Sequence, residues 1–444
     1  MKSNPLSPAR LAALEILLRV EEGAYASVLL ASRAEELQPR DRSLCHELVM
    51  GVLRRQLWLD RLIEYYASRK ITELDAPVRI VLRLGLYQLR FLSRVPASAA
   101  VNESVKLVNL ARLRSASGLV NAVLRRATRE PDVDPASNIQ DPLERIAVST
   151  SHPPWLIERW TKAFGNDEAQ AFARANNEPA PIAFRVVNKR AKESEVIERL
   201  RHAGAELVPS RIESGAWRIR GAGSLLSELT ATGQVYLQDE ASQLIARAVE
   251  ANPGHRVLDL CAAPGSKTTQ IADRTFDSAT ILALDVHDHR LRTVVSSAKL
   301  HGLSGIHCVV ADGLQPLPVW ERSFDRVLVD APCSGTGTLR RNPEIRWRIS
   351  PRDIEDLSGR QKQLLSNASR AVKLGGRLIY STCSVEPDEN EDVRHTFLEN
   401  HKSFESADLR VDSSLITSSG AARTWPHREG TDGFFVCAFK RKGE

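Results

Sequence analysis

The stretch that decides the fold lies at 256–268 and reads Arg256-Val257-Leu258-Asp259-Leu260-Cys261-Ala262-Ala263-Pro264-Gly265-Ser266-Lys267-Thr268. It begins as a short apolar strand and continues into a turn of small residues that opens a helix. Small residues let the backbone approach a ligand, and a helix N-terminus favours anionic groups. Asp285 follows Gly265 by 20 residues, at the end of the next apolar segment, where a carboxylate can bind ribose hydroxyls. We therefore expect this stretch to be the ligand-binding turn of an α/β domain.

Short apolar segments alternate with helical patterns over residues 236–444. This alternation predicts a doubly wound, mostly parallel sheet of the Rossmann-like kind. Asp312 follows the third expected strand, at the carboxyl edge where open α/β sheets bind ligands. The expected strands are Arg256–Leu260, Ile281–Asp285, His307–Ala311, Arg326–Asp330, Arg377–Ser381 and Gly433–Phe439.

Three ligands compete for the turn at 259–268. A phosphate-binding P-loop requires G-x-x-x-x-G-K, but Cys261 stands at the first glycine position and Ser266 precedes Lys267. A dinucleotide fingerprint requires G-x-G-x-x-G, which the turn lacks. S-adenosyl-L-methionine remains, because it has a ribose and an adenine but no phosphates that would need several glycines. Any α/β turn contains small residues, so by itself the turn is weak evidence.

Two cysteines follow neighbouring expected strands and make the prediction specific. Cys333 lies in Asp-Ala-Pro-Cys-Ser-Gly-Thr-Gly at 330–337, and Cys383 lies in Tyr-Ser-Thr-Cys-Ser-Val at 380–385. Both thiols should therefore lie at the carboxyl edge of the sheet, beside the expected cofactor. A lone cysteine is usually an inert buried residue, and we expect that of Cys45, Cys308 and Cys437.

Thiols beside a methyl donor suit the methylation of carbon 5 of cytosine. Carbon 5 is too weak a nucleophile to attack a sulfonium methyl group, but addition of a thiolate to carbon 6 creates an enamine in which carbon 5 is nucleophilic. A base then removes the carbon-5 proton and the thiolate leaves. Since a free thiol has a pKa of about 8.5, the nucleophile needs a positive field or a helix N-terminus. Asp330 can supply a hydrogen bond at N3 of the base, which would promote the addition.

These motifs resemble the Sun/NOL1/NOP2 group of RNA cytosine-C5 methyltransferases. The matching stretches are 236–242, 260–268, 325–341, 375–390 and 432–435. The resemblance implies that Cys383 is the nucleophile and that Cys333 serves product release. DNA cytosine-C5 enzymes use the thiol after proline as the nucleophile, so the presence of both cysteines favours RNA. The family pattern implies a methyl-donor site made of Cys261, Ala262, Ala263, Pro264, Gly265, Ser266, Lys267, Asp285, Asp312 and Asp330. Ser266 departs from the usual glycine and adds a side chain beside the methionine moiety.

Residues 1–140 predict a separate helical domain. Apolar residues recur at helical spacing from 7 to 128, and Pro77 and Pro96 mark helix starts or breaks. The region is similar to the NusB antitermination fold through 40–42, 82–89, 95–96, 100–103 and 120–126. Fused to a catalytic domain of the kind described above, it resembles bacterial small-subunit rRNA methyltransferases, which implies 16S rRNA as the substrate.

Residues 141–235 predict a linker followed by a small α+β RNA-binding module. Prolines are frequent at 131–154, which reads as the linker. Strand character is found at 182–187, 205–209 and 217–220, and helix character at 195–203. We therefore expect three domains, at 1–140, 141–235 and 236–444.

The net charge of +6 is concentrated in the helical region. Residues 1–140 carry 21 Lys and Arg against 15 Asp and Glu, whereas residues 141–444 carry 40 of each. Within the first region, residues 51–130 hold 15 basic and 6 acidic side chains. A local excess of this kind indicates binding of a polyanion such as RNA. A solvated, arginine-rich helical surface is the alternative.

Several charged groups near the motifs have two interpretations. Arg340, Arg341 and Arg346 follow the Cys333 loop and are expected to contact RNA near a flipped base, with a solvated helix start as the alternative. Lys267 is expected to contact the methyl donor or the target base, with a surface role as the alternative. The acidic run Glu386, Asp388, Glu389 and Glu391 is interpreted as a charge set at a helix N-terminus and not as a metal site.

The composition excludes several classes of protein. The chain has 444 residues, 42% hydrophobic and 26% charged, which is ordinary for a globular protein. It contains no run of 18 apolar residues, no secretory leader pattern and no C-x-x-C among its six cysteines. His287 and His289 lack partners for a metal site. We expect a cytoplasmic, monomeric protein with reduced thiols and neither a metal nor a membrane partner.

Two hypotheses of different class follow. The first is an S-adenosyl-L-methionine-dependent methyltransferase that forms 5-methylcytosine in 16S rRNA, or in tRNA or another RNA. The second is a non-catalytic RNA-binding factor of the antitermination kind, whose α/β domain has decayed. The intact thiol pair and the acidic residues at three expected strand ends favour the first.

Overall fold

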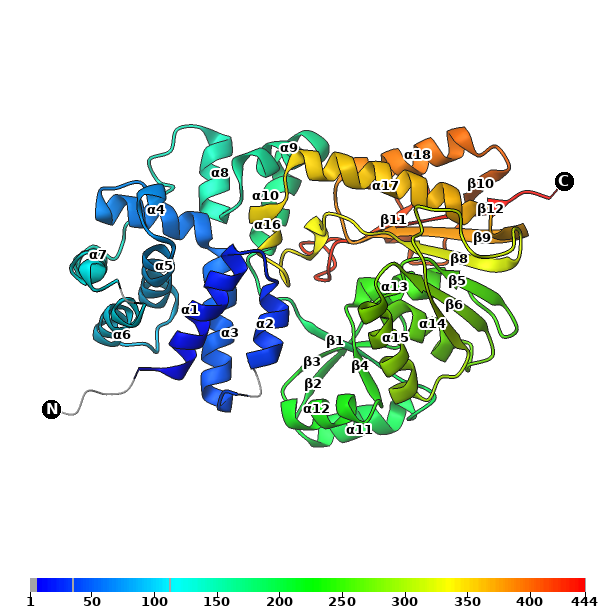
Figure 1. The fold of residues 1–444 in the computed structure, drawn as a ribbon, viewed down its shortest axis with the longest axis horizontal. Helices are drawn as coiled ribbons and strands as arrows, with labels where there is room; N and C mark the ends of the chain where they lie inside the picture. The colour runs from blue at the N-terminus through cyan, green and yellow to red at the C-terminus, as the bar shows by residue number, and fades with distance from the viewer. Residues whose placement is uncertain (1–5, 34–35, 112, 444) are drawn as a thin grey trace. The chain divides into compact units, whose positions relative to one another are not determined.

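The computed structural model describes residues 6–33, 36–111 and 113–443 and contains two compact units (Figure 1). The first unit comprises Met1–Pro179 and Leu339–Arg348. The second comprises Ala180–Thr338 and Ile349–Glu444. A segment of ten residues that follows the Cys333 loop in the sequence is therefore part of the helical unit.

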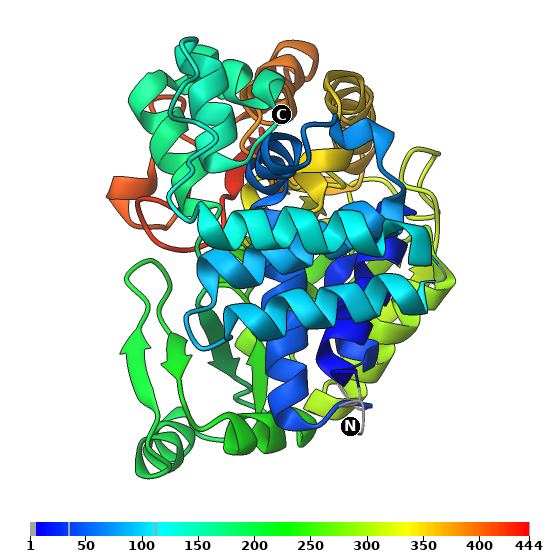
Figure 2. The same cartoon turned by 90° about the vertical axis from the view of Figure 1, so that its left-hand side faces the viewer.

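The first unit is a bundle of helices, as the 3.6-residue periodicity predicts. Helix α5 packs against α1, α3, α4, α6 and α7. Figure 2 faces this bundle, with the helices of residues 76–129 running across the view. Pro77 lies in the first turn of α5 and Pro96 directly precedes α6, where a missing N–H costs nothing. The helices are α1 (Pro8–Glu21), α2 (Ala26–Arg33), α3 (Pro39–Arg54), α4 (Gln56–Ala67), α5 (Ala76–Phe91), α6 (Ala97–Leu110) and α7 (Ser117–Arg129).

The expected linker at 131–154 is only partly a linker. The structure places α8 (Pro142–Thr150) inside it and continues with α9 (Pro154–Phe164) and α10 (Asn166–Ala175). The prolines mislead because Pro142 and Pro154 occupy the first positions of their helices, where proline is favoured. Asp141 caps α8 by accepting a hydrogen bond from the backbone N–H of Glu144 at 2.7 Å.

The small α+β module begins the second unit. Its four strands pair antiparallel in the order β2-β3-β1-β4. Buried side chains from its sheet and helices, such as Phe184, Leu200 and Leu229, form a core of their own. The elements are β1 (Ile182–Val186), α11 (Glu193–His202), β2 (Glu206–Pro209), β3 (Ala216–Arg220), α12 (Gly223–Ala231) and β4 (Val235–Leu237). The sequence predicts β1, α11, β2 and β3 but neither α12 nor β4.

The large sheet has the order β10-β12-β9-β8-β5-β6-β7, with β11 paired to β12. The run from β9 to β7 is parallel, and β10, β11 and β12 add antiparallel pairs. The sheet is therefore mixed, with the expected parallel centre. Its strands are β5 (Arg256–Asp259), β6 (Thr280–Asp285), β7 (Ile306–Val310), β8 (Phe324–Asp330), β9 (Val372–Thr382), β10 (Phe404–Ala407), β11 (Ala422–Arg423) and β12 (Phe435–Arg441).

Helices cover both faces of the large sheet (Figure 1). One face carries α13 (Glu240–Ala248), α14 (Ser266–Arg274) and α15 (Asp288–His301), and the other carries α17 (Pro351–Ser369) and α18 (Glu391–Asn400). On the first face, Leu328 and Ile379 pack in a core with residues of α13, α14 and α15. On the other face, Val327 and Leu378 pack in a core with residues of α17 and α18. This alternation follows from the two-residue period of a strand.

The strand order reverses beside β5, whose neighbours are β6 and β8. Ligands of open α/β sheets bind at the carboxyl ends of strands at such a switch point. Among the helices of the described part of the chain, none is both long and apolar enough to cross a bilayer.

Candidate active site

The turn between β5 and α14 is tied to the end of β6. The backbone N–H of Ala262 donates to Leu284 O at 2.8 Å, and that of Ala263 reaches Asp285 Oδ2 at 3.3 Å. Gly265 has φ +103°, and a Cβ there would lie 3.0 Å from the Cα of Val294 in α15. Only glycine fits such a conformation and such a close approach. The turn Cys261–Lys267 is therefore held close to the end of β6 and to α15, and its contact with the methyl donor stays a prediction.

The acidic residues at the strand ends lie where the sequence places them. Asp285 is the last residue of β6, and its Oδ1 accepts the backbone N–H of His287 at 3.0 Å. Its Oδ2 lies 3.8 Å from Arg290 Nη1. Asp312 follows β7 and accepts the backbone N–H of Leu314 at 2.9 Å. Two carboxylates thus stand at neighbouring strand ends, next to the turn.

Asp259 is a further polar residue of this region, and no role is predicted for it from the sequence. It is 1% exposed, and its Oδ2 accepts a hydrogen bond from Thr268 Oγ1 at 2.7 Å. Burial raises the pKa of Asp259 to about 7. Its other oxygen, Oδ1, has no hydrogen-bond partner among the described residues. Its place at the last position of β5 is the signal that could have identified it.

Lys267 and Asp330 form an ion pair at the carboxyl edge of the large sheet. Lys267 Nζ lies 2.6 Å from Asp330 Oδ2, and Ser381 Oγ donates to Asp330 Oδ1 at 2.7 Å. Burial by itself would lower the pKa of Lys267, but Asp330 outweighs that effect and the pKa is raised. Nζ also lies 5.3 Å from the centroid of the Phe434 ring. A surface role for Lys267 is wrong, since the residue is only 9% exposed.

The two motif cysteines meet. Cys333 Sγ and Cys383 Sγ lie 3.2 Å apart, and both residues are half-buried. The Gly337 N–H donates to Cys383 O at 3.0 Å, while Gly337 O accepts the Gly433 N–H at 2.8 Å. A Cβ on Gly337 would lie 1.9 Å from Gly433 O, so the loops approach each other more closely than any side chain there would allow. The hydrogen bond with Cys383, together with burial, raises the pKa of Cys333 well above its usual value.

The structure does not support an RNA contact for Arg340 and Arg346. Both are buried in the first unit, and Arg346 is fully inaccessible. Its guanidinium donates to Ser151 O, Asn177 Oδ1 and Asn176 O at 3.1, 2.9 and 3.2 Å. Arg346 therefore binds the inserted segment, Leu339–Arg348, to the rest of the helical unit. Arg341 is only half-buried, and its RNA contact stays a prediction.

Other residues of the inserted segment bind the helical unit in the same way. Arg340 O accepts from Arg54 Nη2 at 2.8 Å, and Glu344 Oε1 accepts the Ala26 N–H at 2.9 Å. Trp347 Nε1 donates to Leu53 O at 3.1 Å. A run of arginines after a catalytic loop resembles a phosphate-binding surface in sequence, whereas here much of it serves packing and hydrogen bonding.

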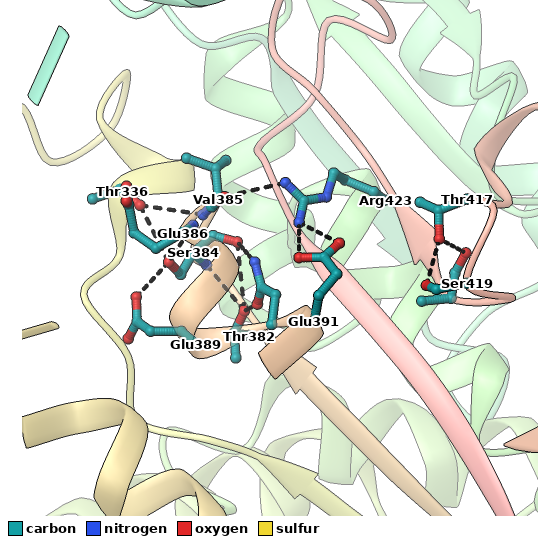
Figure 3. A network of polar contacts seen from close by, with 12 residues as sticks. Thr336, Thr382, Ser384, Val385, Glu386, Glu389, Glu391, Thr417, Ser419 and Arg423 are labelled. Atoms are coloured by element: carbon teal, nitrogen blue, oxygen red, sulfur yellow. Dashed lines mark hydrogen bonds and ion pairs between the residues drawn. The ribbon is translucent and has the colours of Figure 1, made fainter. Parts of the chain in front are cut away.

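The acidic run after Cys383 divides into two environments (Figure 3). Glu391 starts α18 and forms a bidentate pair with Arg423 at 2.8 Å, which agrees with the predicted charge set at a helix N-terminus. Glu389, in the 3₁₀ helix η4 (Pro387–Glu389), contradicts that prediction because it is fully buried and turned toward the cysteine loops. No group of three or more His, Cys, Asp and Glu side chains suited to a metal ion occurs among the described residues.

Three family models match consecutive parts of the chain. Residues 7–129 match the NusB family, and residues 152–225 match the ferredoxin-like domain of RsmF/B-like methyltransferases. Residues 246–440 match the model described as 16S rRNA methyltransferase RsmB/F.

Curated relatives match over almost the whole length. A probable ribosomal RNA small subunit methyltransferase B of Bacillus subtilis is 34% identical, over 97% of this chain and 98% of the relative. The corresponding protein of Synechocystis is 36% identical over 94% and 96%. The ribosomal RNA small subunit methyltransferase B of Pseudomonas putida is 34% identical over 96% and 97%.

Solved structures share the architecture. The crystal structure of PH0851 is 28% identical and covers 99% of both chains with a TM-score of 0.85. A methyltransferase homolog protein from Pyrococcus horikoshii is 27% identical, with a TM-score of 0.60 over 68% of this chain and all of that one. The helical bundle, the ferredoxin-like module and the Rossmann-like domain are thus a known combination.

Proposed function

Since the chain belongs to the ribosomal RNA small subunit methyltransferase B family, a family of methyltransferase enzymes, we propose that it methylates carbon 5 of a cytosine in 16S rRNA. S-adenosyl-L-methionine is the proposed methyl donor. The observation that carries the proposal is the thiol pair, Cys333 and Cys383, at 3.2 Å beside the carboxylate-lined turn. A thiol that adds to carbon 6 is what the chemistry of carbon 5 requires.

The residues of the turn fit the proposed cofactor. S-adenosyl-L-methionine carries positive charge on its sulfonium and its ammonium group, and the carboxylates Asp259, Asp285 and Asp312 line the strand ends. We expect Asp285 to accept hydrogen bonds from the ribose hydroxyls, and the backbone of 261–267 to hold the methionine part. When bound, the cofactor supplies an electrophilic methyl group.

The two thiols have separate proposed roles. Cys383 adds to carbon 6 of the target base, and Cys333 assists the departure of Cys383 after methyl transfer. The Asp330 carboxylate accepts a hydrogen bond from N3 of the cytosine once that nitrogen is protonated, and so favours the addition. Its two oxygens are fixed by Lys267 and Ser381, so the carboxyl group is oriented before the base arrives. The base must leave its stack to reach the thiols.

Cysteine variants test the proposal on a 16S rRNA transcript with radiolabelled cofactor. Cys383→Ala should abolish methyl transfer, because no adduct at carbon 6 can form. Cys333→Ala should retain the attack but accumulate a protein–RNA adduct that survives denaturing electrophoresis. Cys437→Ala, a buried cysteine of β12 away from the strand ends, is the control. A Cys383→Ala protein that methylates normally would refute the proposed mechanism.

A non-catalytic RNA-binding role finds no support. The curated relatives quoted above carry methyltransferase names over the full length of the chain, and both thiols are in place. The monomeric state stays a prediction, which sedimentation of the purified protein would test.

A further inference from the structure

Glu389 is a fully buried carboxylate that the chemistry proposed above does not use. Burial of a carboxylate is costly unless its lone pairs are satisfied by hydrogen bonds. It lies in η4, which follows the Cys383 loop. A side chain whose burial carries such a cost should have a structural or catalytic task.

Each oxygen of the Glu389 carboxylate accepts two hydrogen bonds. Oε1 accepts the backbone N–H of Ser334 at 2.8 Å and Gln361 Nε2 at 2.9 Å. Oε2 accepts the hydroxyls of both Ser334 and Ser384 through short hydrogen bonds. The carboxylate therefore has all its usual acceptor sites occupied, by groups from three different parts of the second unit.

The partners of Glu389 are the immediate neighbours of the two thiols. Ser334 follows Cys333, and Ser384 follows Cys383. Figure 3 shows Ser384 and Thr336, from the two loops, on the side toward which Glu389 points. One carboxylate thus joins the two loops one residue away from the sulfur atoms that lie 3.2 Å apart.

The carboxylate of Glu389 is the common acceptor for the hydroxyl groups of Ser334 and Ser384. Each serine hydroxyl has one proton to donate, and both protons are directed to Glu389 Oε2. The hydrogen bond of 3.0 Å from Ser334 Oγ to Ser384 Oγ competes for the same Ser334 proton. A glutamine of the same shape could accept with one end only, and its NH₂ group would face a donor.

We propose that Glu389 is the positioning residue that holds the Cys333 and Cys383 loops in the register required by the two-thiol reaction. The proposal rests on the proposed function for its catalytic consequence, but the geometric part stands by itself. The negative charge of Glu389 also affects the thiol of Cys333. The pKa of Cys333 is raised first by the hydrogen bond with Cys383, then by burial and by the charge of Cys383, and Glu389 adds to these.

Glu389→Gln tests the catalytic consequence by steady-state kinetics with a 16S rRNA transcript. Asp392→Asn is the matched control, because Asp392 is an exposed carboxylate directly after the acidic run, in the first turn of α18. We expect kcat of Glu389→Gln to fall about tenfold or more, with KM for RNA and cofactor within about twofold, since misplacement of a reacting group by 1 Å can cost a hundredfold. Because Glu389 acts through Ser384, adding Ser384→Ala to Glu389→Gln should cost little more.

A disulfide assay measures the register without using the methylation reaction. Diamide oxidises the thiols of Cys333 and Cys383 to a disulfide and takes up both electrons and both protons as it becomes a hydrazine. Peptide mapping by mass spectrometry follows that bond specifically. We expect it to form about tenfold more slowly in Glu389→Gln than in Asp392→Asn, because thiols held apart must move to react.

The two measurements separate the two proposals. If the wild-type protein fails to methylate RNA but Glu389→Gln slows the disulfide, the proposed function fails and the positioning role stands. If Glu389→Gln matches Asp392→Asn in both kcat and disulfide rate, the positioning role is wrong. Should Glu389→Gln not fold, Ser384→Ala removes the hydrogen bond between the carboxylate and the Cys383 loop and keeps Glu389 bonded to Ser334 and Gln361. An unchanged disulfide rate in that variant would equally overturn the inference.

Discussion

Lys267 Nζ lies 2.6 Å from Asp330 Oδ2 and joins the first turn of α14 to the C-terminal end of β8. The contact connects the cofactor turn to the strand that leads into the Cys333 loop. It brings together two residues that are 63 positions apart in the sequence.

Lys267→Met should destabilise the protein and impair catalysis. Removing one partner of a fully buried ion pair costs about 3–5 kcal/mol. A quarter of the Asp330 side chain is exposed, so we expect about 2 kcal/mol from urea denaturation of the second unit. Methyl transfer in a single turnover should fall at least about tenfold, because Asp330 loses its orienting donor. Lys299→Met, an exposed lysine of α15, is the control. Equal stability of the two variants would contradict the importance of the pair.

Gly337→Ala should separate the cysteine loops. A Cβ at Gly337 would lie 1.9 Å from the backbone oxygen of Gly433, which no rotation of a side chain can relieve. We expect methyl transfer to fall by about a hundredfold, since the thiols would move by a substantial fraction of an ångström. Gly359→Ala is the matched substitution, because a Cβ in that part of α17 meets no atom within 4 Å. Normal turnover of Gly337→Ala would show that the close approach is not required.

Asp259 should make stability depend on pH in a defined direction. Its pKa in the folded state is about 7 because of burial, which lies above the ordinary carboxyl value. The folded state therefore binds more protons than the unfolded state between about pH 4 and pH 7, and its stability falls as the pH rises through that window. Asp259→Asn removes this contribution.

The measurement for Asp259 is the difference in the free energy of unfolding between wild type and Asp259→Asn from pH 4 to pH 8. We expect the wild type to lose stability relative to the variant as the pH rises. Asp277→Asn is the contrasting variant: hydrogen bonds from Gly305 and Ser304 outweigh partial burial and lower the pKa of Asp277. Its contribution is therefore lost only below about pH 4, and its difference should stay nearly constant from pH 4 to pH 8. A difference that does not change with pH in Asp259→Asn would contradict the raised pKa of the buried Asp259.

Arg346→Met should lower stability without changing the number of phosphate contacts. The guanidinium is buried and donates to Ser151, Asn176 and Asn177, so its loss leaves acceptors unpaired at about 1–3 kcal/mol. The melting temperature should fall, whereas the slope of log K against log salt concentration for RNA binding should stay unchanged. Arg69→Met, an exposed arginine, is the stability control. A slope reduced by about one unit in Arg346→Met would restore the RNA contact that the sequence suggests.

Much of the fold follows from local patterns. The periodicity of 7–128 predicts a helical bundle, and the apolar segments that alternate with helical patterns predict the strands β5 to β9 and β12, because both signals depend on neighbouring residues. The prolines at 142 and 154 are ambiguous in the same way, since proline both ends and begins helices. The short antiparallel strands β10 and β11 escape because pairing at the sheet edge depends on distant residues.

The site divides along the same line. The sequence by itself determined the residue types of the chemistry: a small-residue turn, carboxylates at strand ends and two thiols after neighbouring strands. These are local features, and strand order brings them to one edge of a parallel sheet. Only the tertiary structure decided that Arg346 is a buried tie and Glu389 an acceptor between the cysteine loops, because burial and hydrogen-bond partners come from residues remote in sequence. A charged side chain looks the same in a sequence whether it faces RNA or a buried serine.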